Sequence, residues 1–144
     1  MVAAVNPDSD SITLMDAVTL EVIEEVPVGD DPRTLSFTPD SRALLVANQG
    51  SANVTILDVA RSRRIVQIPV GSMPYGVVTD GQHAFIAEFA LGNLAVIDLS
   101  DNSVVKRLPV GPFPAGLALL HWAPDDVGDV QGGLLLVAHF FNGQ

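Results

Sequence analysis

A repeated segment of the form Pro-Val-Gly-x-x-Pro constrains this chain more than any other feature of its sequence. It begins at Pro27, Pro69 and Pro109. Two further series of residues keep nearly the same spacing: Asp16, Asp58 and Asp98, and Asn6, Asn48 and Glu88. Three landmarks in one register identify an internal repeat, which is the first property to establish because it decides the class of fold.

Each repeat contains four short segments with the character of β-strands. In the middle repeat these are residues 43–47, 54–58, 63–70 and 76–79, separated by turn-forming asparagine, glycine, serine and aspartate. No window shows the sustained periodicity of an amphipathic helix. A four-stranded antiparallel unit of about 40 residues has the size of one propeller blade. We therefore predict an all-β fold of β-propeller blades. A parallel β-solenoid is the alternative, but its repeats are shorter.

The same segments resemble the YVTN-type β-propeller repeat family. The resemblance is carried by residues 45–48, 54–58, 68–71 and 74–77, and residues 37–42 are similar to the Ser-Pro-Asp-Gly-Arg turn of that repeat. It covers essentially the whole chain and is specific for fold. It is not specific for function, because the family includes cell-surface proteins and relatives of amine dehydrogenase and of haem-containing propellers.

The resemblance also implies which strands lie inside and outside the propeller. The strands that follow Pro32, Pro74 and Pro114 would be innermost. The strands that carry the first proline of each repeated segment would be outermost: Pro27, Pro69 and Pro109. Proline tolerates such an edge position because it has no backbone N–H to donate.

In this register the chain is a single β-propeller segment, residues 1–144, that does not complete a ring. It divides into an incomplete first blade (1–31), two full blades (32–73 and 74–113) and a partial last blade (114–144). This amounts to roughly 13 strands, or about three and a quarter blades, whereas propellers close with about four to eight blades. Two explanations stay open: the chain is a piece of a longer propeller, or another chain or a second copy completes the ring.

The last repeat departs from the common spacing. The interval from Pro114 to His139 is clearly longer than the equivalent intervals from Pro32 to Asn48 and from Pro74 to Glu88. We assign the extra residues to a loop insertion within 121–133, between the first and second strands of a blade. Loops on a rigid scaffold often carry function, although an insertion without a function is the alternative.

Composition excludes several classes of function. Seventeen acidic residues against seven basic ones give a formal charge of -10, which argues against a nucleic-acid partner. No stretch reaches the roughly 18 uninterrupted apolar residues of a membrane span. The chain has no cysteine, which excludes disulfides, thiolate metal sites, cysteine nucleophiles and the usual covalent attachment of haem. Residues 1–5 lack the features of a signal peptide, whereas the family resemblance implies an extracytoplasmic location, periplasmic or at the cell surface.

Two series of residues are candidates for a ligand-binding face. The first shares the position at the end of the second strand: Asn6, Asn48, Glu88 and His139. Glu88 and His139 replace asparagine with groups that exchange protons or bind metals, although each side chain could simply cap its own turn. The second follows the repeated proline at the expected mouth of the central channel: Arg33, Tyr75 and Ala115. From both series we predict that a ligand is bound by Arg33, Tyr75, Asn48, Glu88 and His139.

No pattern in the sequence assigns catalysis, a metal or a cofactor. His83 and His121 are expected on the face opposite to His139, so the three histidines do not form a metal triad. The acidic residues of the loop insertion lack the ligand spacing of a calcium loop: Asp125, Asp126 and Asp129. Phosphate-binding, serine-hydrolase and zinc-hydrolase signatures are absent from the sequence. We therefore predict no catalytic residues, no metal site and no cofactor.

The leading hypothesis is a non-catalytic binding or interaction module that contacts a protein or a ligand through loops on one face. The alternative, from a different class, is a portion of a propeller enzyme or electron-transfer subunit, amine dehydrogenase-like or haem-associated. A structural component of a surface layer is a third possibility. We expect the partner to be another protein chain, or a second copy of this one, that completes the propeller.

Overall fold

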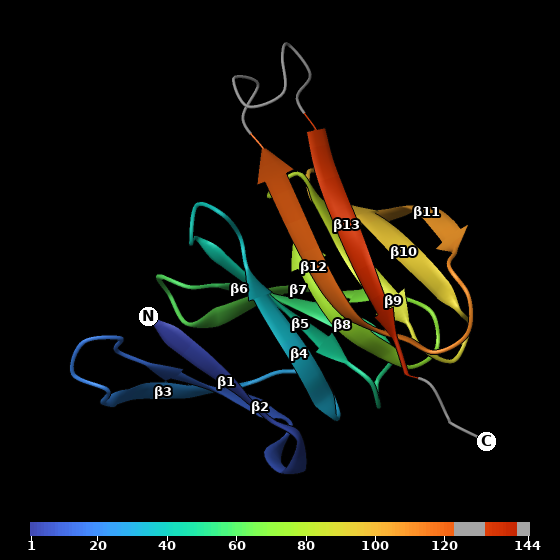
Figure 1. Ribbon diagram of the computed structural model, residues 1–144. Coiled ribbons are helices and arrows are strands. Elements are labelled where there is room, and N and C mark those ends of the chain that lie inside the picture. The colour runs from blue at the N-terminus through green and yellow to red at the C-terminus, as the bar shows by residue number, and fades with distance from the viewer. Residues whose placement is uncertain (123–131, 141–144) are drawn as a thin grey trace.

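The computed structural model describes residues 1–122 and 132–140, and the predicted fold class is confirmed in it (Figure 1). Apart from the short 3-10 turn η1 (Pro7–Ser9), every regular element among these residues is a β-strand. No helix in the described portion of the chain is long and apolar enough to cross a membrane. Most of the predicted insertion 121–133, including Asp125, Asp126 and Asp129, lies outside the described residues.

The strands form four antiparallel sheets that follow one another along the chain. The first contains β1 (Val2–Asn6), β2 (Ser11–Met15) and β3 (Val22–Pro27). The second contains β4 (Pro32–Phe37), β5 (Ala43–Asn48), β6 (Asn53–Asp58) and β7 (Arg63–Pro69). The third contains β8 (Pro74–Thr79), β9 (His83–Glu88), β10 (Asn93–Asp98) and β11 (Ser103–Pro109). The fourth pairs β12 (Pro114–Trp122) with β13 (Gly132–His139).

The first strand of each blade lies at the inside of the arc. In the described residues β4 packs against β8, and β8 packs against β12, so these three strands lie side by side in the middle of the structure (Figure 1). The opposite edge of each of the first three sheets is formed by β3, β7 and β11. These edge strands end at Pro27, Pro69 and Pro109. The inner and outer strands therefore have the positions that the repeat implies.

Two apolar clusters hold successive sheets together. One lies between the first and second sheets and includes Ile12, Leu14, Leu44, Val46 and Leu57. The other lies between the second and third sheets and includes Leu45, Val54, Ile56, Ile86 and Ile97. Because successive residues of a strand point to opposite faces, β5 places Leu44 and Val46 in one cluster and Leu45 and Ala47 in the other. A continuous apolar run is thus what a sheet buried on both faces requires.

The Asp16, Asp58 and Asp98 series is explained by turns at one end of the strands. Each carboxylate accepts backbone N–H groups of the turn that follows, for example the amides of Val18 and Thr19 at 2.7 and 2.9 Å from Asp16. These two amides, with that of Thr19 first, hold the pKa of Asp16 below its ordinary value. A hydrogen bond from the Arg61 side chain lowers the pKa of Asp58, and one from the Ser100 hydroxyl lowers that of Asp98.

Gly76 allows the inner strands β8 and β12 to approach closely. A Cβ atom at this position would lie 2.1 Å from the backbone oxygen of Ala115. A backbone atom of a packed strand cannot move aside as a flexible side chain does, so the strands would have to separate. Between β4 and β8 the equivalent position holds Thr34, whose hydroxyl donates to the backbone oxygen of Tyr75.

We expect Gly76→Ala to lower the free energy of unfolding by about 1–3 kcal/mol, the usual cost of overpacking, or to prevent folding. Urea denaturation followed by circular dichroism measures this change. Gly116→Ala is the matched control, because Gly116 has the same repeat position and its added Cβ would meet only the Ala138 side chain at 3.3 Å. Equal losses in the two variants would contradict the close approach of β8 and β12.

Candidate functional site

The connections at one end of the strands form a surface that we call the loop face. It consists of the loops between the second and third strands of each blade and the connections from each blade to the next. The antiparallel register brings both kinds of loop together, since Pro32 pairs with Asn48, Pro74 with Glu88, and Pro114 with His139. The predicted binding residues therefore lie at the same end of the propeller.

The loops share one backbone structure, which is shown by repeated hydrogen bonds. Three equivalent amides donate across the two loops of a blade: Val28 to Asp10 O (2.9 Å), Val70 to Ala52 O (3.0 Å) and Val110 to Gly92 O (3.0 Å). Three more link each second strand to the preceding connection: Gln49 to Asp31 O (2.9 Å), Phe89 to Met73 O (3.0 Å) and Phe140 to Phe113 O (3.0 Å). Differences between the loops are therefore differences of side chain.

The side chains at the ends of the second strands bind atoms of their own loops. The Asn48 amide donates to Asn53 Oδ1 at 2.7 Å and to Thr55 Oγ1 at 2.8 Å, and Asn48 is fully buried. Asn6 donates in the same way to Ser11 and Thr13. The Nδ1 atom of His139 lies 2.8 Å from the backbone oxygen of Pro112. These contacts are the turn-capping arrangement that was the alternative to ligand binding.

Glu88 carries a fully buried carboxylate that is neutralised within its blade. Its Oε1 accepts from the amide of Gly71 at 2.7 Å and from Arg107 Nε at 3.0 Å, and its Oε2 lies 3.2 Å from Arg107 Nε. A buried charge is tolerated only when it is paired and hydrogen-bonded in this way. Glu88 thus binds the connection that contains Gly71, whereas the Asn48 amide binds two residues of β6. A direct contact of either side chain with a ligand stays a prediction.

Arg107 was missed by sequence reasoning, although the repeat contains a signal for it. Arg107 occupies the repeat position of Glu25 and Gln67, opposite Ala95 on the neighbouring strand. The positions equivalent to Ala95 hold Thr13 and Thr55. The polar set Asn48, Thr55 and Gln67 of one blade is therefore replaced by Glu88, Ala95 and Arg107 in the next. An acid has replaced asparagine together with a base that neutralises it.

Arg33 and Tyr75, two of the predicted ligand-binding residues, line one cavity on the loop face. Gln49, Phe89 and Phe140 also line this cavity, which has a volume of about 340 Å³. Arg33 donates from Nε to the Gln49 side chain, and its Nη2 lies 2.8 Å from Asp31 Oδ2. Ala115, the third member of this series, is buried and contributes no lining side chain.

Four aromatic side chains gather beside Arg33. The ring centroids of Phe89 and Phe113 are 5.3 Å apart, those of Tyr75 and Phe140 are 5.8 Å apart, and Phe89 lies 6.0 Å from both Tyr75 and Phe140. These separations are typical of aromatic pairs. Only Tyr75 was predicted. The missed residues have a common signal, because Phe89 and Phe140 share the repeat position of Gln49, and Phe113 shares that of Asp31.

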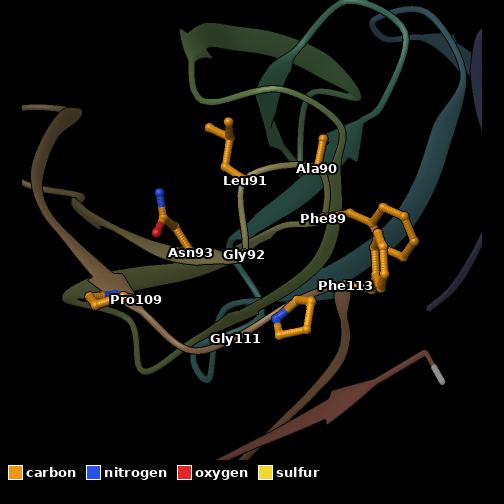
Figure 2. Close-up of a pocket in the computed structure, with 9 residues that line it drawn as sticks. Phe89, Ala90, Leu91, Gly92, Asn93, Pro109, Gly111 and Phe113 are labelled. Atoms are coloured by element: carbon orange, nitrogen blue, oxygen red, sulfur yellow. The ribbon is translucent and has the colours of Figure 1, made fainter.

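A second hollow continues from the aromatic cluster. It has a volume of about 430 Å³ and lies between the loop that follows β9 and the connection that follows β11. Figure 2 shows Phe89 and Phe113 at one end of this groove and Asn93 and Pro109 at the other. Phe89 lines both hollows, so they adjoin.

The described residues offer no group of three or more histidine, aspartate or glutamate side chains that could hold a metal ion. His83 begins β9 and His139 ends β13, which places them at opposite ends of the strands.

A protein-family model matches more than half of the chain. The family model described as YNCE-like beta-propeller matches residues 1–86. No curated protein matches the sequence.

Solved structures similar to this chain include three longer proteins. Hydrazine synthase from Kuenenia stuttgartiensis is 31% identical with a TM-score of 0.73, over 78% of this chain and 33% of that chain. The dihydro-heme d1 dehydrogenase NirN in complex with DHE is 22% identical with a TM-score of 0.64, over 81% of this chain and 26% of that chain. A functionally unknown protein from Desulfotomaculum acetoxidans DSM 771 is 17% identical with a TM-score of 0.72, over 81% of this chain and 38% of that chain. The chain therefore spans well under half the length of each of these proteins.

The dependence of the polar residues on one another can be tested by introducing the polar set of one blade at the equivalent positions of the next. We expect Glu88→Asn alone to lower the free energy of unfolding by about 2–4 kcal/mol, because Arg107 and the amide of Gly71 lose their acceptor. Adding Ala95→Thr and Arg107→Gln should recover at least half of this loss, since the triple variant reproduces the set Asn48, Thr55 and Gln67. Urea denaturation at neutral pH measures both changes.

The double variant Ala95→Thr, Arg107→Gln is the control for this experiment. It keeps Glu88 but removes the cation, so we expect it to be less stable than the triple variant. Additive effects of the three substitutions would show that the residues do not act as one set.

Proposed function

The chain belongs to the YNCE-like beta-propeller family, and on that premise we propose that it is a non-catalytic binding module whose partner docks on the loop face. We also propose that its repeats are of the YVTN type, divided into an incomplete first blade (residues 1–31), blades 32–73 and 74–113, and a partial last blade (residues 114–144). The residues that resemble that repeat support this finer assignment, and so does the order of the four sheets.

One observation carries the proposed function: loops with the same backbone present very different side chains. Gln49, Ser51 and Asp31 of one blade correspond to Phe89, Leu91 and Met73 of the next. In the partial last blade, Phe140 and Phe113 occupy the positions of Gln49 and Asp31. Because polar residues serve the fold equally well at these positions, folding does not require the apolar ones.

The apolar side chains are also exposed to solvent. Leu91 is 51%, Phe113 42% and Phe140 54% exposed. Contiguous exposed apolar side chains of this kind commonly mark interaction sites. Phe113 adopts the left-handed backbone conformation, with φ of 55°, which is unfavourable for a bulky residue. An exposed phenylalanine in an unfavourable backbone conformation is best explained by contact with a partner.

We propose in addition that further blades complete the arc, supplied either by a longer polypeptide or by another chain. The exposure of Leu120, Leu134 and Leu136 on β12 and β13, at 52%, 47% and 48%, supports this. So does the small share of the similar solved structures that this chain spans.

A second candidate function is a portion of a propeller enzyme or of an electron-transfer subunit. The likeness to hydrazine synthase, at 31% identity, favours it. For the binding module we expect protein purified from its native source to show no absorbance in the visible region after complete removal of other proteins. A visible band that copurifies in a fixed ratio with the chain would favour the enzyme or electron-transfer function instead.

Photo-crosslinking tests the proposed binding face directly. The photoreactive residue p-benzoylphenylalanine is introduced in place of Leu91, on the loop face, or in place of Asp101, an exposed residue at the opposite end of the strands. On irradiation in the source cells, we expect discrete protein adducts from position 91 and none above background from position 101. Adducts of equal yield from both positions, or from neither, would contradict docking on the loop face.

A further inference from the structure

The loop face is divided into two halves of opposite character. The aromatic half consists of exposed or half-buried apolar side chains from the third and fourth sheets and their connection: Phe89, Leu91, Phe113 and Phe140. The acidic half consists of carboxylates from the first sheet and from the connection to the second: Asp8, Asp10, Asp30 and Asp31. We propose that the loop face binds a polypeptide segment that carries aromatic or leucine anchors next to lysine or arginine side chains. This inference rests on the proposed binding function and specifies the chemistry of the partner.

The shape of the aromatic half suits an extended chain. The cavity of about 340 Å³ beside Arg33 and the groove of about 430 Å³ beyond Phe89 adjoin, because Phe89 lines both. Figure 2 shows the residues that line the groove. Two adjoining hollows accept two side chains of one segment, whereas a compact molecule would fill only one. Aromatic and leucine side chains fit such hollows because apolar side chains line both. Tyr75, Phe89 and Phe140 line the cavity, and Phe89, Leu91 and Phe113 line the groove.

The charges of the acidic half define the other portion of the partner. Four carboxylates lie there against one cation, Arg33, which is already paired with Asp31 at 2.8 Å. Arg107 is occupied by Glu88 and adds no net charge. Glu25, which has the repeat position of Arg107, accepts from the hydroxyls of Ser9 and Ser11 and adds a fifth carboxylate. The described residues of the loop face therefore carry an excess of four negative charges, in a chain of formal charge -10. This field attracts cationic segments and repels nucleic acid and anionic lipid surfaces.

The two halves are joined by direct contacts, so one segment can reach both. The amide of Asp31 donates to Asp10 Oδ1 at 2.9 Å, and Asp31 binds Arg33. Arg33 in turn lines the same cavity as Phe89 and Phe140. Lysine or arginine residues adjacent to an apolar anchor would thus lie over the carboxylates while the anchor occupies the cavity.

Fluorescence anisotropy with labelled synthetic peptides of equal length tests this inference on the purified protein. One peptide combines lysine with tryptophan and leucine, a second combines lysine with serine, and a third combines glutamate with tryptophan and leucine. We expect the first peptide to bind about tenfold or more tightly than the other two, and to weaken as the salt concentration rises from about 50 to 500 mM. Equal binding of the first two, preference for the third, absence of binding, or binding of anionic phospholipid vesicles instead would overturn it.

Variants taken from the repeat itself locate the contact. Leu91→Ser and Phe113→Asp introduce the residues found at the equivalent positions Ser51 and Asp31. The backbone is compatible, because Asp31 has φ of 51° where Phe113 has 55°. We expect the pair to weaken binding of the lysine–tryptophan–leucine peptide about tenfold. Asp8→Asn with Asp30→Asn should weaken it mainly at low salt.

Two matched controls separate these effects from general changes in surface. Val105→Thr removes an exposed apolar side chain on the outer strand β11, and Asp101→Asn removes a charge at the opposite end of the strands. Both should change the affinity less than about twofold, with circular dichroism confirming that every variant is folded. Equal losses in the controls would overturn the inference.

The two proposals fail in different ways. Adducts from position 91 without any preference for the lysine–tryptophan–leucine peptide would leave the binding function standing and reject the partner chemistry. If neither adducts nor peptide binding are observed, both proposals are wrong.

Discussion

The pairing of the first and second strands of each blade is the constraint on which the rest of the structure depends. The repeated proline that begins a first strand lies opposite the last residue of the second strand, in the pairs Pro32–Asn48, Pro74–Glu88 and Pro114–His139. Because the pairing is antiparallel, the two kinds of loop must meet at one end of the sheet. The same register aligns the inner strands, whose close approach depends on the absence of a side chain at Gly76.

Two consecutive blades reach the same backbone structure by different polar chemistry. In one, the neutral side chains of Asn48 and Gln67 both donate to Thr55, whereas in the next a buried carboxylate is held by Arg107. Neither arrangement is interchangeable one residue at a time, since a buried acceptor without its donor is costly. The scaffold is therefore specified by sets of residues rather than by single residues.

Much of the fold could be predicted from the sequence, because the strands found in one repeat give the positions of the equivalent strands in all the others. Asp16, Asp58 and Asp98 mark the turns, and the prolines mark the edges. The candidate site could be predicted only partly. Arg107 was not predicted, because its ion pair is with Glu88, which is distant in the sequence and lies two strands away in the sheet. The aromatic cluster was not predicted, because the candidate residues were chosen mainly among the charged and polar members of the repeat. Its unpredicted members are Phe89, Phe113 and Phe140. Their clustering depends on the distance between blades, which no local pattern reveals.

The separation of scaffold and loop side chains explains how a binding surface can arise on such a fold. The connections of the loop face within the described residues are fixed by backbone hydrogen bonds. Gln49 and its counterpart Phe89, or Asp31 and Phe113, therefore have the same backbone support. The residues that differ most between blades are thus those with the least effect on the fold. The aromatic side chains lie together on adjacent blades rather than being scattered around the ring. Random drift would not favour that grouping, whereas a single partner that spans neighbouring blades would.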